Sequence, residues 1–200
     1  QKYYLQTLQK HQSDFSEFQI TIEATHHGPT ALTKPTIFIE IGTTQKQYLQ
    51  ILKKHKSDFL EFQITIEATH HGPTALTKPS IFIEIGTTEK QWTDNSLCIS
   101  VAKLIHQVFV NTISENPVAI CFGGTHYPTK FTHELLEGKY ALGTVMPKHA
   151  LNELDEELFS HILSQNKMAK FALLDWRGLG TNKQKILDLL KSTSLEIIKL

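Results

Sequence analysis

The feature that most constrains this chain is a tandem repeat, because residues 1–44 (copy one) and 45–88 (copy two) are nearly the same sequence. The two copies differ at six positions and agree at the other thirty-eight. Solenoid proteins keep a pattern while the rest of each repeat drifts, and they stack three or more repeats. Two nearly unchanged copies therefore indicate a recent duplication, or an artefact of sequencing or assembly, rather than a repeat fold.

The repeat also sets the expected domain organisation. We assign residues 1–44 to an extra helix–strand–loop–strand unit and residues 45–200 to an α/β catalytic domain. Copy two continues into the rest of the chain, so it is the copy expected to contribute to a working site. Copy one has three alternative places: beside copy two in one sheet, in the place of N-terminal strands, or exchanged with copy two.

Hydrophobic patterning predicts the elements. Residues 62–68 alternate apolar and polar side chains, which is typical of a strand and places Glu67 on its polar face. After an eleven-residue loop, a second strand is expected over residues 80–85. Asp94 or Ser96 is expected to cap a long helix. Further strands are predicted over residues 117–122, 140–146, 169–175 and 195–200, with helices over 132–136, 155–165 and 181–191.

This order of elements predicts the fold class. Residues 117–122 are apolar throughout, as in a strand that is covered on both faces. Strands that alternate with helices favour an α/β fold with a mixed, largely parallel sheet and helices packed on it. We expect a layered architecture like that of phosphorylases and hydrolases.

Composition excludes several classes of protein. Twenty basic and twenty acidic residues cancel, and Arg177 is the only arginine. No run approaches the ~18 apolar residues of a membrane span, and no signal peptide is recognisable. Cys98 and Cys121 lie in apolar surroundings without metal-type spacing, which favours buried free thiols in a reducing compartment. We therefore expect a cytoplasmic protein without a membrane partner, and a monomer.

Three polar turns follow predicted strands directly. The first is Glu67-Ala-Thr-His-His-Gly-Pro-Thr74, which copy one repeats at residues 23–30. The second is Gly123-Gly-Thr-His126, and the third is Asp175-Trp-Arg-Gly178. In open α/β sheets, ligands bind at the carboxyl ends of the strands. The coincidence of these turns with strand ends predicts a site.

The glycine turn predicts anion binding. Gly123 and Gly124 allow the backbone to approach a ligand closely, so the amides of Gly123, Gly124 and Thr125 can point at an anion or a developing oxyanion. Lys130 follows in the sequence and is a candidate to neutralise a phosphate or carboxylate, although a solvated surface lysine is the alternative.

The histidines predict acid–base or metal chemistry. Neighbouring residues of an extended backbone point in opposite directions, so one of His70 and His71 is expected to face the site while the other packs or orients it. Glu67, one of these histidines and His126 match the ligand types of a zinc site with an open position. The same three groups would serve as general base, orienter and electrophile in a hydrolysis. The spacing leaves both possibilities open, with His70, Glu67 and His126 as the candidate metal ligands.

Longer motifs resemble a known family. Glu67–Thr74, the stretch Ile81-Phe-Ile-Glu-Ile-Gly-Thr-Thr-Glu-Lys-Gln-Trp92 and Phe122-Gly-Gly-Thr-His-Tyr-Pro-Thr-Lys-Phe-Thr132 are similar to the D-aminoacyl-tRNA deacylase of the archaeal and plant type. Pro147–Leu151 and Leu174–Leu179 agree with the same family. The resemblance covers about residues 45–200. Members of the family carry a further N-terminal α/β segment with another histidine-containing stretch, and this chain has copy one instead.

The resemblance implies a function. It implies a zinc-associated hydrolase that cleaves the ester between a D-amino acid and the terminal ribose of tRNA, in translation quality control. The expected partner is tRNA carrying a D-amino acid, bound by lysines such as Lys130, Lys139 and Lys148. The expected catalytic residues are His126, His70, His71, Glu67 and Lys130, and the substrate or oxyanion contacts are Thr69, Gly123, Gly124 and Thr125.

Two other readings stay open at this point. One is a catalytically impaired, truncated and duplicated paralogue that acts at most as an RNA-binding module. The other is a different metal-dependent hydrolase on the same scaffold, acting on small nucleosides or peptides. Deacylation of D-aminoacyl-tRNA against the L-ester separates the first from an active enzyme, and salt-sensitive tRNA affinity counts against the second.

Overall fold

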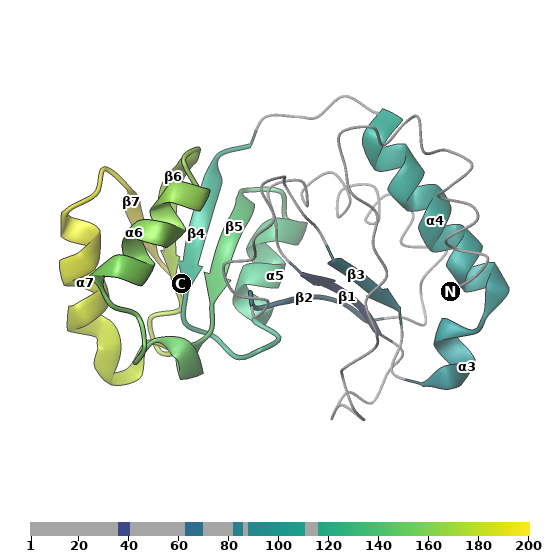
Figure 1. Ribbon diagram of the computed structural model, residues 1–200, viewed down its shortest axis with the longest axis horizontal. Helices are drawn as coiled ribbons and strands as arrows, with labels where there is room; N and C mark the ends of the chain where they lie inside the picture. Colours follow the sequence, from purple (N-terminus) through teal and green to yellow (C-terminus); the bar gives the residue numbers. More distant parts are fainter. Residues whose placement is uncertain (1–35, 41–62, 70–81, 86–87, 111–115) are drawn as a thin grey trace.

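A computed structural model describes residues 36–40, 63–69, 82–85, 88–110 and 116–200 (Figure 1). Its larger sheet has four strands in the order β5-β4-β6-β7, and all neighbouring strands are parallel. These strands are β4 (Val118–Phe122), β5 (Ala141–Met146), β6 (Ala169–Leu174) and β7 (Glu196–Lys199). The connections carry α5 (Thr129–Leu136), the 3₁₀ turn η3 (Lys148–Ala150), α6 (Glu156–Gln165), the 3₁₀ turn η4 (Gly180–Asn182) and α7 (Lys183–Lys191).

The second sheet contains strands from both copies of the repeat. Its order is β2-β1-β3, where β1 is Thr36–Glu40, β2 is Gln63–Glu67 and β3 is Phe82–Ile85. β1 runs parallel to β2 and antiparallel to β3. A strand of copy one therefore lies between two strands of copy two, in one sheet. The described strand of copy one thus lies in the same sheet as copy two, and the place of the rest of copy one stays a prediction.

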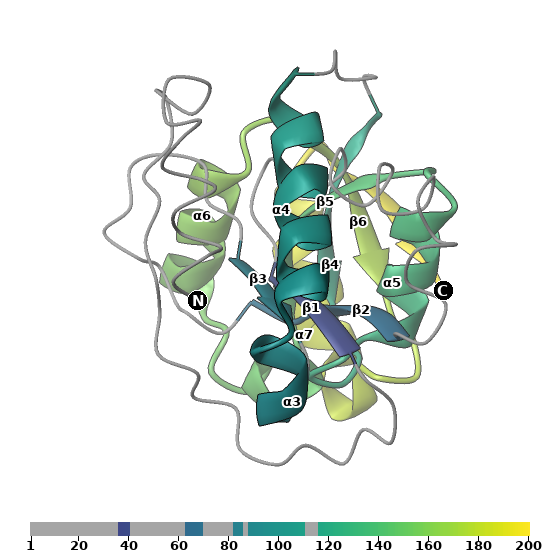
Figure 2. The ribbon, with the colours of Figure 1, turned by 90° about the vertical axis from the view of Figure 1, so that its right-hand side faces the viewer.

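Two helices precede the larger sheet. They are α3 (Glu89–Trp92) and α4 (Asn95–Val110), which lies beside the smaller sheet, at the end of the molecule away from α7 (Figures 1 and 2). Asp94 caps α4, because its Oδ1 accepts hydrogen bonds from the amides of Ser96 at 2.8 Å and Leu97 at 3.1 Å. The hydrogen bond from the Ser96 side chain, followed by the one from the Leu97 amide, lowers the pKa of Asp94. Of the two expected caps, Asp94 is the one observed.

The core consists of two apolar clusters, one on each face of β4. Ala119 and Cys121 belong to the cluster that also includes side chains of α4, α5 and β2. Ile120 and Phe122 belong to the cluster formed with α6 and α7. Figure 1 shows the same layers, with α6 and α7 on one side of the sheet and α5 between that sheet and β2. The prediction that this strand is covered on both faces is confirmed.

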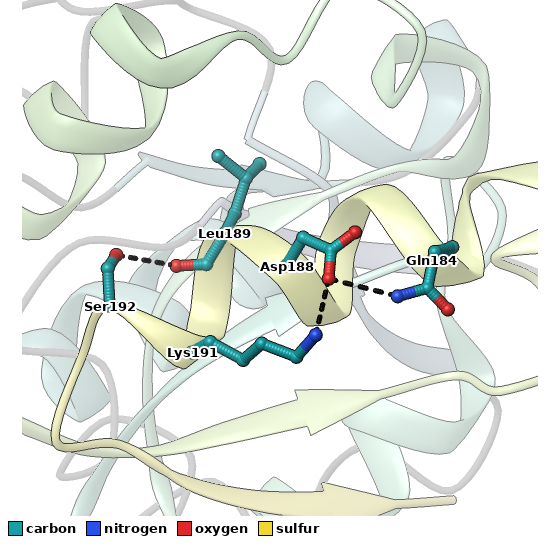
Figure 3. A network of polar contacts seen from close by, with 5 residues as sticks. All are labelled: Gln184, Asp188, Leu189, Lys191 and Ser192. Atoms are coloured by element: carbon teal, nitrogen blue, oxygen red, sulfur yellow. Dashed lines mark hydrogen bonds and ion pairs between the residues drawn. The ribbon is translucent and has the colours of Figure 1, made fainter.

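The outer face of α7 carries a polar network (Figure 3). Asp188 Oδ1 accepts hydrogen bonds from Lys191 Nζ at 2.7 Å and Gln184 Nε2 at 2.9 Å. The hydrogen bond from Lys191, followed by that from Gln184, lowers the pKa of Asp188. The inner face of the helix buries Ile186 and Leu190. Asp188 and Lys191 thus form an ordinary surface pair, remote from the strand-end turns.

The predicted class, a mixed α/β fold with a parallel sheet and packed helices, is confirmed, with an all-parallel larger sheet and a smaller sheet that has one parallel and one antiparallel pairing. The main correction concerns α5, which begins at Thr129 and not at Thr132. The Thr132 amide donates to the Pro128 carbonyl, so Thr129 and Lys130 belong to the first turn of the helix. No helix among the described residues is both long and apolar enough to cross a membrane.

Candidate active site at the strand ends

A carboxylate and an imidazole meet where the two sheets join. Glu67 is the last residue of β2, and His126 lies in the turn between β4 and α5. His126 Nε2 lies 3.3 Å from Glu67 Oε1. The Glu67 side chain is only 2% exposed, whereas that of His126 is 34% exposed. The polar face predicted for β2 is therefore buried at Glu67, which corrects the expectation from simple alternation, and the accessible member of the pair is His126.

Backbone hydrogen bonds hold this contact in place. The Ala68 amide donates to the His126 carbonyl at 2.8 Å, and the Thr69 amide donates to the Val145 carbonyl at 2.9 Å. The Val145 amide in turn donates to Thr69 Oγ1 at 3.1 Å. The end of β2 is thus tied both to the turn after β4 and to β5. Thr69, predicted as a substrate contact, also acts as a structural link between the sheets.

Both residues of the glycine turn have positive φ angles. Gly123 and Gly124 have φ angles of 101° and 81°, which side chains other than glycine rarely adopt. The Gly123 amide donates to the Met146 carbonyl at 2.9 Å, and the Gly124 carbonyl accepts from the Lys148 amide at 2.9 Å. Because the Gly123 amide is used within the fold, the oxyanion prediction narrows to the amides of Gly124 and Thr125.

The residues after the glycines present polar groups at the surface. Thr125 is exposed, and its hydroxyl donates to the Tyr127 carbonyl at 2.8 Å. The His126 ring packs edge-on against the Tyr127 ring, with 4.9 Å between the ring centroids. The Tyr127 ring therefore supports one side of the imidazole that contacts Glu67.

Lys130 does not extend freely into solvent. Its Nζ donates to Asp175 Oδ1 at 2.8 Å and to the Leu200 carbonyl at 2.9 Å. It lines a shallow depression in the surface together with Thr129, His133, Glu134 and Leu200. Asp175 was not assigned a role from the sequence, because the turn that begins with it showed only that a polar segment follows a strand. Its contact with Lys130 joins residues 45 positions apart, which no local pattern reveals.

His70 and His71 lie outside the described residues, as does the histidine pair of copy one. Within the described part of the chain, no three His, Cys, Asp or Glu side chains form a group that could hold a metal ion. The two candidate ligands that are described, Glu67 and His126, do lie together. The remaining proposed ligand, His70, stays a prediction.

Fold and site together define a class: an α/β protein whose strand-end turns bring a buried carboxylate to a partly exposed histidine beside a glycine turn. Comparison with known proteins identifies the family. The family model described as D-aminoacyl-tRNA deacylase matches residues 1–51 and, again, residues 44–198. The chain belongs to the D-aminoacyl-tRNA deacylase family. The double match follows the repeat, since the first range spans copy one and the second begins at copy two.

Curated relatives agree with this assignment. A D-aminoacyl-tRNA deacylase of Cenarchaeum symbiosum is 45% identical over 99% of this chain and 60% of its own length. That of Hyperthermus butylicus is 41% identical over 76% of this chain and 40% of its own length. That of Methanocaldococcus jannaschii is 30% identical over 90% of this chain and 54% of its own length. The chain thus spans about half the length of these curated relatives.

The fold has a counterpart among solved structures. A crystal structure of a conserved protein of unknown function superposes with a TM-score of 0.78, over 86% of this chain and 68% of that one. The two sequences are 23% identical, so this likeness concerns the fold.

Proposed function

We propose that this protein hydrolyses the ester bond of D-aminoacyl-tRNA, releasing the free D-amino acid and tRNA. The observation that carries the proposal is the contact of 3.3 Å between His126 Nε2 and Glu67 Oε1, beside a glycine turn at the strand ends. Membership of the deacylase family and the names of the relatives support the choice of substrate. Because the relatives are longer than this chain, its own activity is a matter for experiment.

The geometry supports His126 as the general base. If Nε2 carries its proton toward Glu67, Nδ1 is the nitrogen with the lone pair. Nδ1 then removes a proton from water as the water oxygen attacks the ester carbonyl carbon. The same proton passes to the ribose oxygen as the carbon–oxygen bond breaks, which leaves the amino acid as its carboxylate after ionisation. Glu67 holds the ring in this tautomer and stabilises the imidazolium that forms in between.

The backbone supplies the other part of the mechanism. The tetrahedral intermediate places a negative charge on the former carbonyl oxygen, and the amides of Gly124 and Thr125 are the groups proposed to stabilise it. His70 and His71, in the same turn as Glu67, remain proposed substrate contacts, and Thr69 positions that turn through its bonds to Val145.

Zinc is part of the proposal, and the described donors fit it. Glu67 Oε1 and His126 Nε2 lie 3.3 Å apart, and a carboxylate together with an imidazole is a set of donors that zinc takes in proteins. This route is the alternative to the one in which His126 is the general base: Glu67 and a His126 without its Nε2 proton would hold the ion, with His70 as the third ligand. Bound there, zinc would lower the pKa of a water molecule and polarise the ester carbonyl.

The number of zinc ions bound per chain tests whether Glu67 and His126 hold the metal. After removal of metal by a chelator and readdition of zinc, mass spectrometry of the metal content should give about one bound zinc per chain in the wild type. The substitutions Glu67→Gln and His126→Ala should each weaken its retention. Full retention by both variants would exclude these two ligands, and no retention by the wild type would leave His126 as a base that acts without metal.

Replacement of His126 tests the reaction itself. His126→Ala should lower the rate of deacylation of D-Tyr-tRNA by at least ~100-fold, because a general base of this kind contributes about 10²–10⁴. His161→Ala is the matched control, since His161 lies on α6, away from the strand ends. Rates measured on D-Tyr-tRNA and L-Tyr-tRNA with added zinc give both the activity and the preference for the D-ester over the L-ester. Turnover of His126→Ala at the wild-type rate would remove this residue from the mechanism.

The tRNA is expected to contact lysines around the site. Lys148 is exposed and follows β5, whereas Lys139 pairs with Glu134 at 3.2 Å and Lys130 with Asp175. If the wild type binds tRNA with steep salt dependence but hydrolyses neither ester, the RNA-binding alternative applies. If it hydrolyses small esters without salt-sensitive tRNA affinity, the other hydrolase alternative applies.

A further inference from the structure

Asp175 connects the glycine turn with Lys130. It follows β6 and is partly buried, with 15% of its side chain exposed against 42% for Lys130. Its Oδ1 lies 2.8 Å from Lys130 Nζ, and the same ammonium donates to the Leu200 carbonyl at 2.9 Å. Two of the three N–H groups of Lys130 are therefore committed to the protein.

The other oxygen of Asp175 lies close to the glycine turn. A Cβ placed on Gly178 would come within 2.6 Å of Asp175 Oδ2 and within 2.6 Å of the Gly124 amide nitrogen. Asp175 Oδ2 and the Gly124 nitrogen thus lie within a few ångström of each other, on the same side of Gly178. A Cβ on Gly123 would lie 3.0 Å from the Asp175 carbonyl oxygen. The turns after β4 and β6 approach so closely because glycine occupies both.

This packing gives the Lys130 ammonium a defined place. A typical exposed lysine pairs with a carboxylate for less than about 1 kcal/mol and samples many rotamers. Here two acceptors on different elements, Asp175 and Leu200, hold one nitrogen atom at the edge of the depression beside α5. The carboxylate that holds it also lies next to the amide proposed for oxyanion stabilisation.

We propose that Asp175 is a positioning residue of the hydrolase, acting through Lys130. It holds the ammonium so that the remaining N–H of Lys130 contacts a phosphate of the acceptor end of the tRNA while the ester lies over the glycine turn. This rests on the proposed function, because it assigns a substrate group to Lys130 within that site. Asp175 also neutralises most of the charge of Lys130, so the pair favours a correctly placed phosphate over anions in general.

Asp175→Asn should separate the positioning of the Lys130 ammonium from the neutralisation of its charge. The substitution keeps the shape but frees the ammonium, so kcat should fall by about 10- to 100-fold because the substrate loses its alignment. Affinity for tRNA should not fall with it, since an unpaired lysine is available to phosphate. The slope of log affinity against log salt should steepen by up to about 0.7–0.9, because the Asp175 carboxylate no longer offsets the charge of Lys130 at the phosphate that it contacts.

Asp188→Asn is the matched control. Asp188 pairs with Lys191 at 2.7 Å on the outer face of α7, so its replacement also frees a surface lysine but leaves the site alone (Figure 3). Asp188→Asn should leave kcat unchanged. An equal loss of kcat in both variants would overturn the role of Asp175.

A double-mutant cycle tests whether Asp175 acts through Lys130. Lys130→Ala should lower kcat, and adding Asp175→Asn to it should cause no further loss, because the two residues act as one unit. If Asp175→Asn lowers kcat by the same factor in both backgrounds, or lowers only the melting temperature with salt slope and kcat unchanged, its role is structural and the proposal fails.

Two further measurements distinguish failure of this proposal from failure of the proposed function. Lys130→Arg keeps the positive charge but changes the head group. If the position of the ammonium matters, this variant should lose most of kcat. Retained activity would overturn the proposal even if Asp175→Asn does not fold. Binding of uncharged tRNA is measured in parallel. If the wild type fails to deacylate yet binds tRNA, the proposed function fails, while the change of salt slope in Asp175→Asn still reports on the Lys130 contact.

Discussion

At the scale of single residues, the chain buries an ionisable side chain, which is energetically unfavourable without a partner. Glu67 is a carboxylate with 2% of its side chain exposed, in contact with His126. Removing an ion from water costs several kcal/mol unless a partner compensates. Such an arrangement is characteristic of sites where ionisable groups are held for chemistry, and it distinguishes Glu67 from the surface carboxylates of α7.

Cys121 is buried for the opposite reason, as an apolar member of the core. Burial in β4 raises the pKa of its thiol well above the ordinary value of 9.0. The folded state therefore keeps the thiol proton at a pH where the unfolded chain loses it. The free energy of unfolding contains a contribution that is complete below about pH 9 and declines as the pH rises through the folded pKa.

We expect this decline to be measurable. Above about pH 9, Cys121 should lower the free energy of unfolding by up to about 1.4 kcal/mol per pH unit. Urea unfolding of the wild type and of Cys121→Ala at a series of pH values from neutral to alkaline measures the difference, because lysines and tyrosines titrate alike in both. Equal slopes in the two proteins would contradict the assignment.

At the scale of elements, the repeat places the same sequence in two structural positions. Residues 36–40 and 80–84 differ only in Thr36 and Ser80. β1 lies between two strands, whereas β3 is an edge strand in the described sheet. Consecutive amides of a strand point to opposite sides, so each amide of a central strand faces a neighbour and every second amide of an edge strand does not.

Proline substitutions distinguish the two positions. Phe38→Pro and Ile39→Pro in β1 should both destabilise the protein, by about 1–3 kcal/mol each for the unsatisfied backbone partner. Of Phe82→Pro and Ile83→Pro in β3, only one should do so, because the other removes an amide that faces outward. Denaturant unfolding of the four variants provides the comparison. The same pattern in both strands would show that copies one and two exchange places in the sheet.

At the scale of the whole molecule, the site depends on how the two sheets are joined. Glu67 belongs to the smaller sheet, while His126, the glycine turn and Asp175 belong to the larger one. The hydrogen bonds from Ala68 and Thr69 to His126 and Val145 connect them, and α5 packs against β2. A displacement of about 1 Å between reacting groups can lower a rate by 10²-fold, so the proposed reaction should depend on this junction.

Thr69→Val tests the junction. The substitution removes the acceptor of the Val145 amide, which should lower the stability by about 1–3 kcal/mol and reduce deacylation through the displaced Glu67. Thr193→Val is the control, because the Thr193 hydroxyl donates to Leu190 at the end of α7, away from the site. Melting temperature and kcat are measured for both. Reduced activity in the two variants alike would show a general effect of stability.

The sequence alone determined the class of fold, the repeat and the turns that carry the chemistry. Alternation and apolar runs predict strands because the period of side chains along a strand is a local property. The run at residues 117–122 predicted burial on both faces for the same reason. The family motifs pointed to the family and so to the proposed substrate, since they are long enough to be specific.

Only the tertiary structure decided which of these groups meet. Glu67 and His126 are 59 positions apart and belong to different sheets, and Lys130 reaches Asp175 across 45 positions. Sequence spacing carries no information on such contacts, because they depend on strand order and on the approach of one turn to another. The place of β1 is the strongest example, because no local feature of two nearly identical sequences explains their different positions. Among the described strands, β1 is enclosed by two neighbours and β3 lies at the edge.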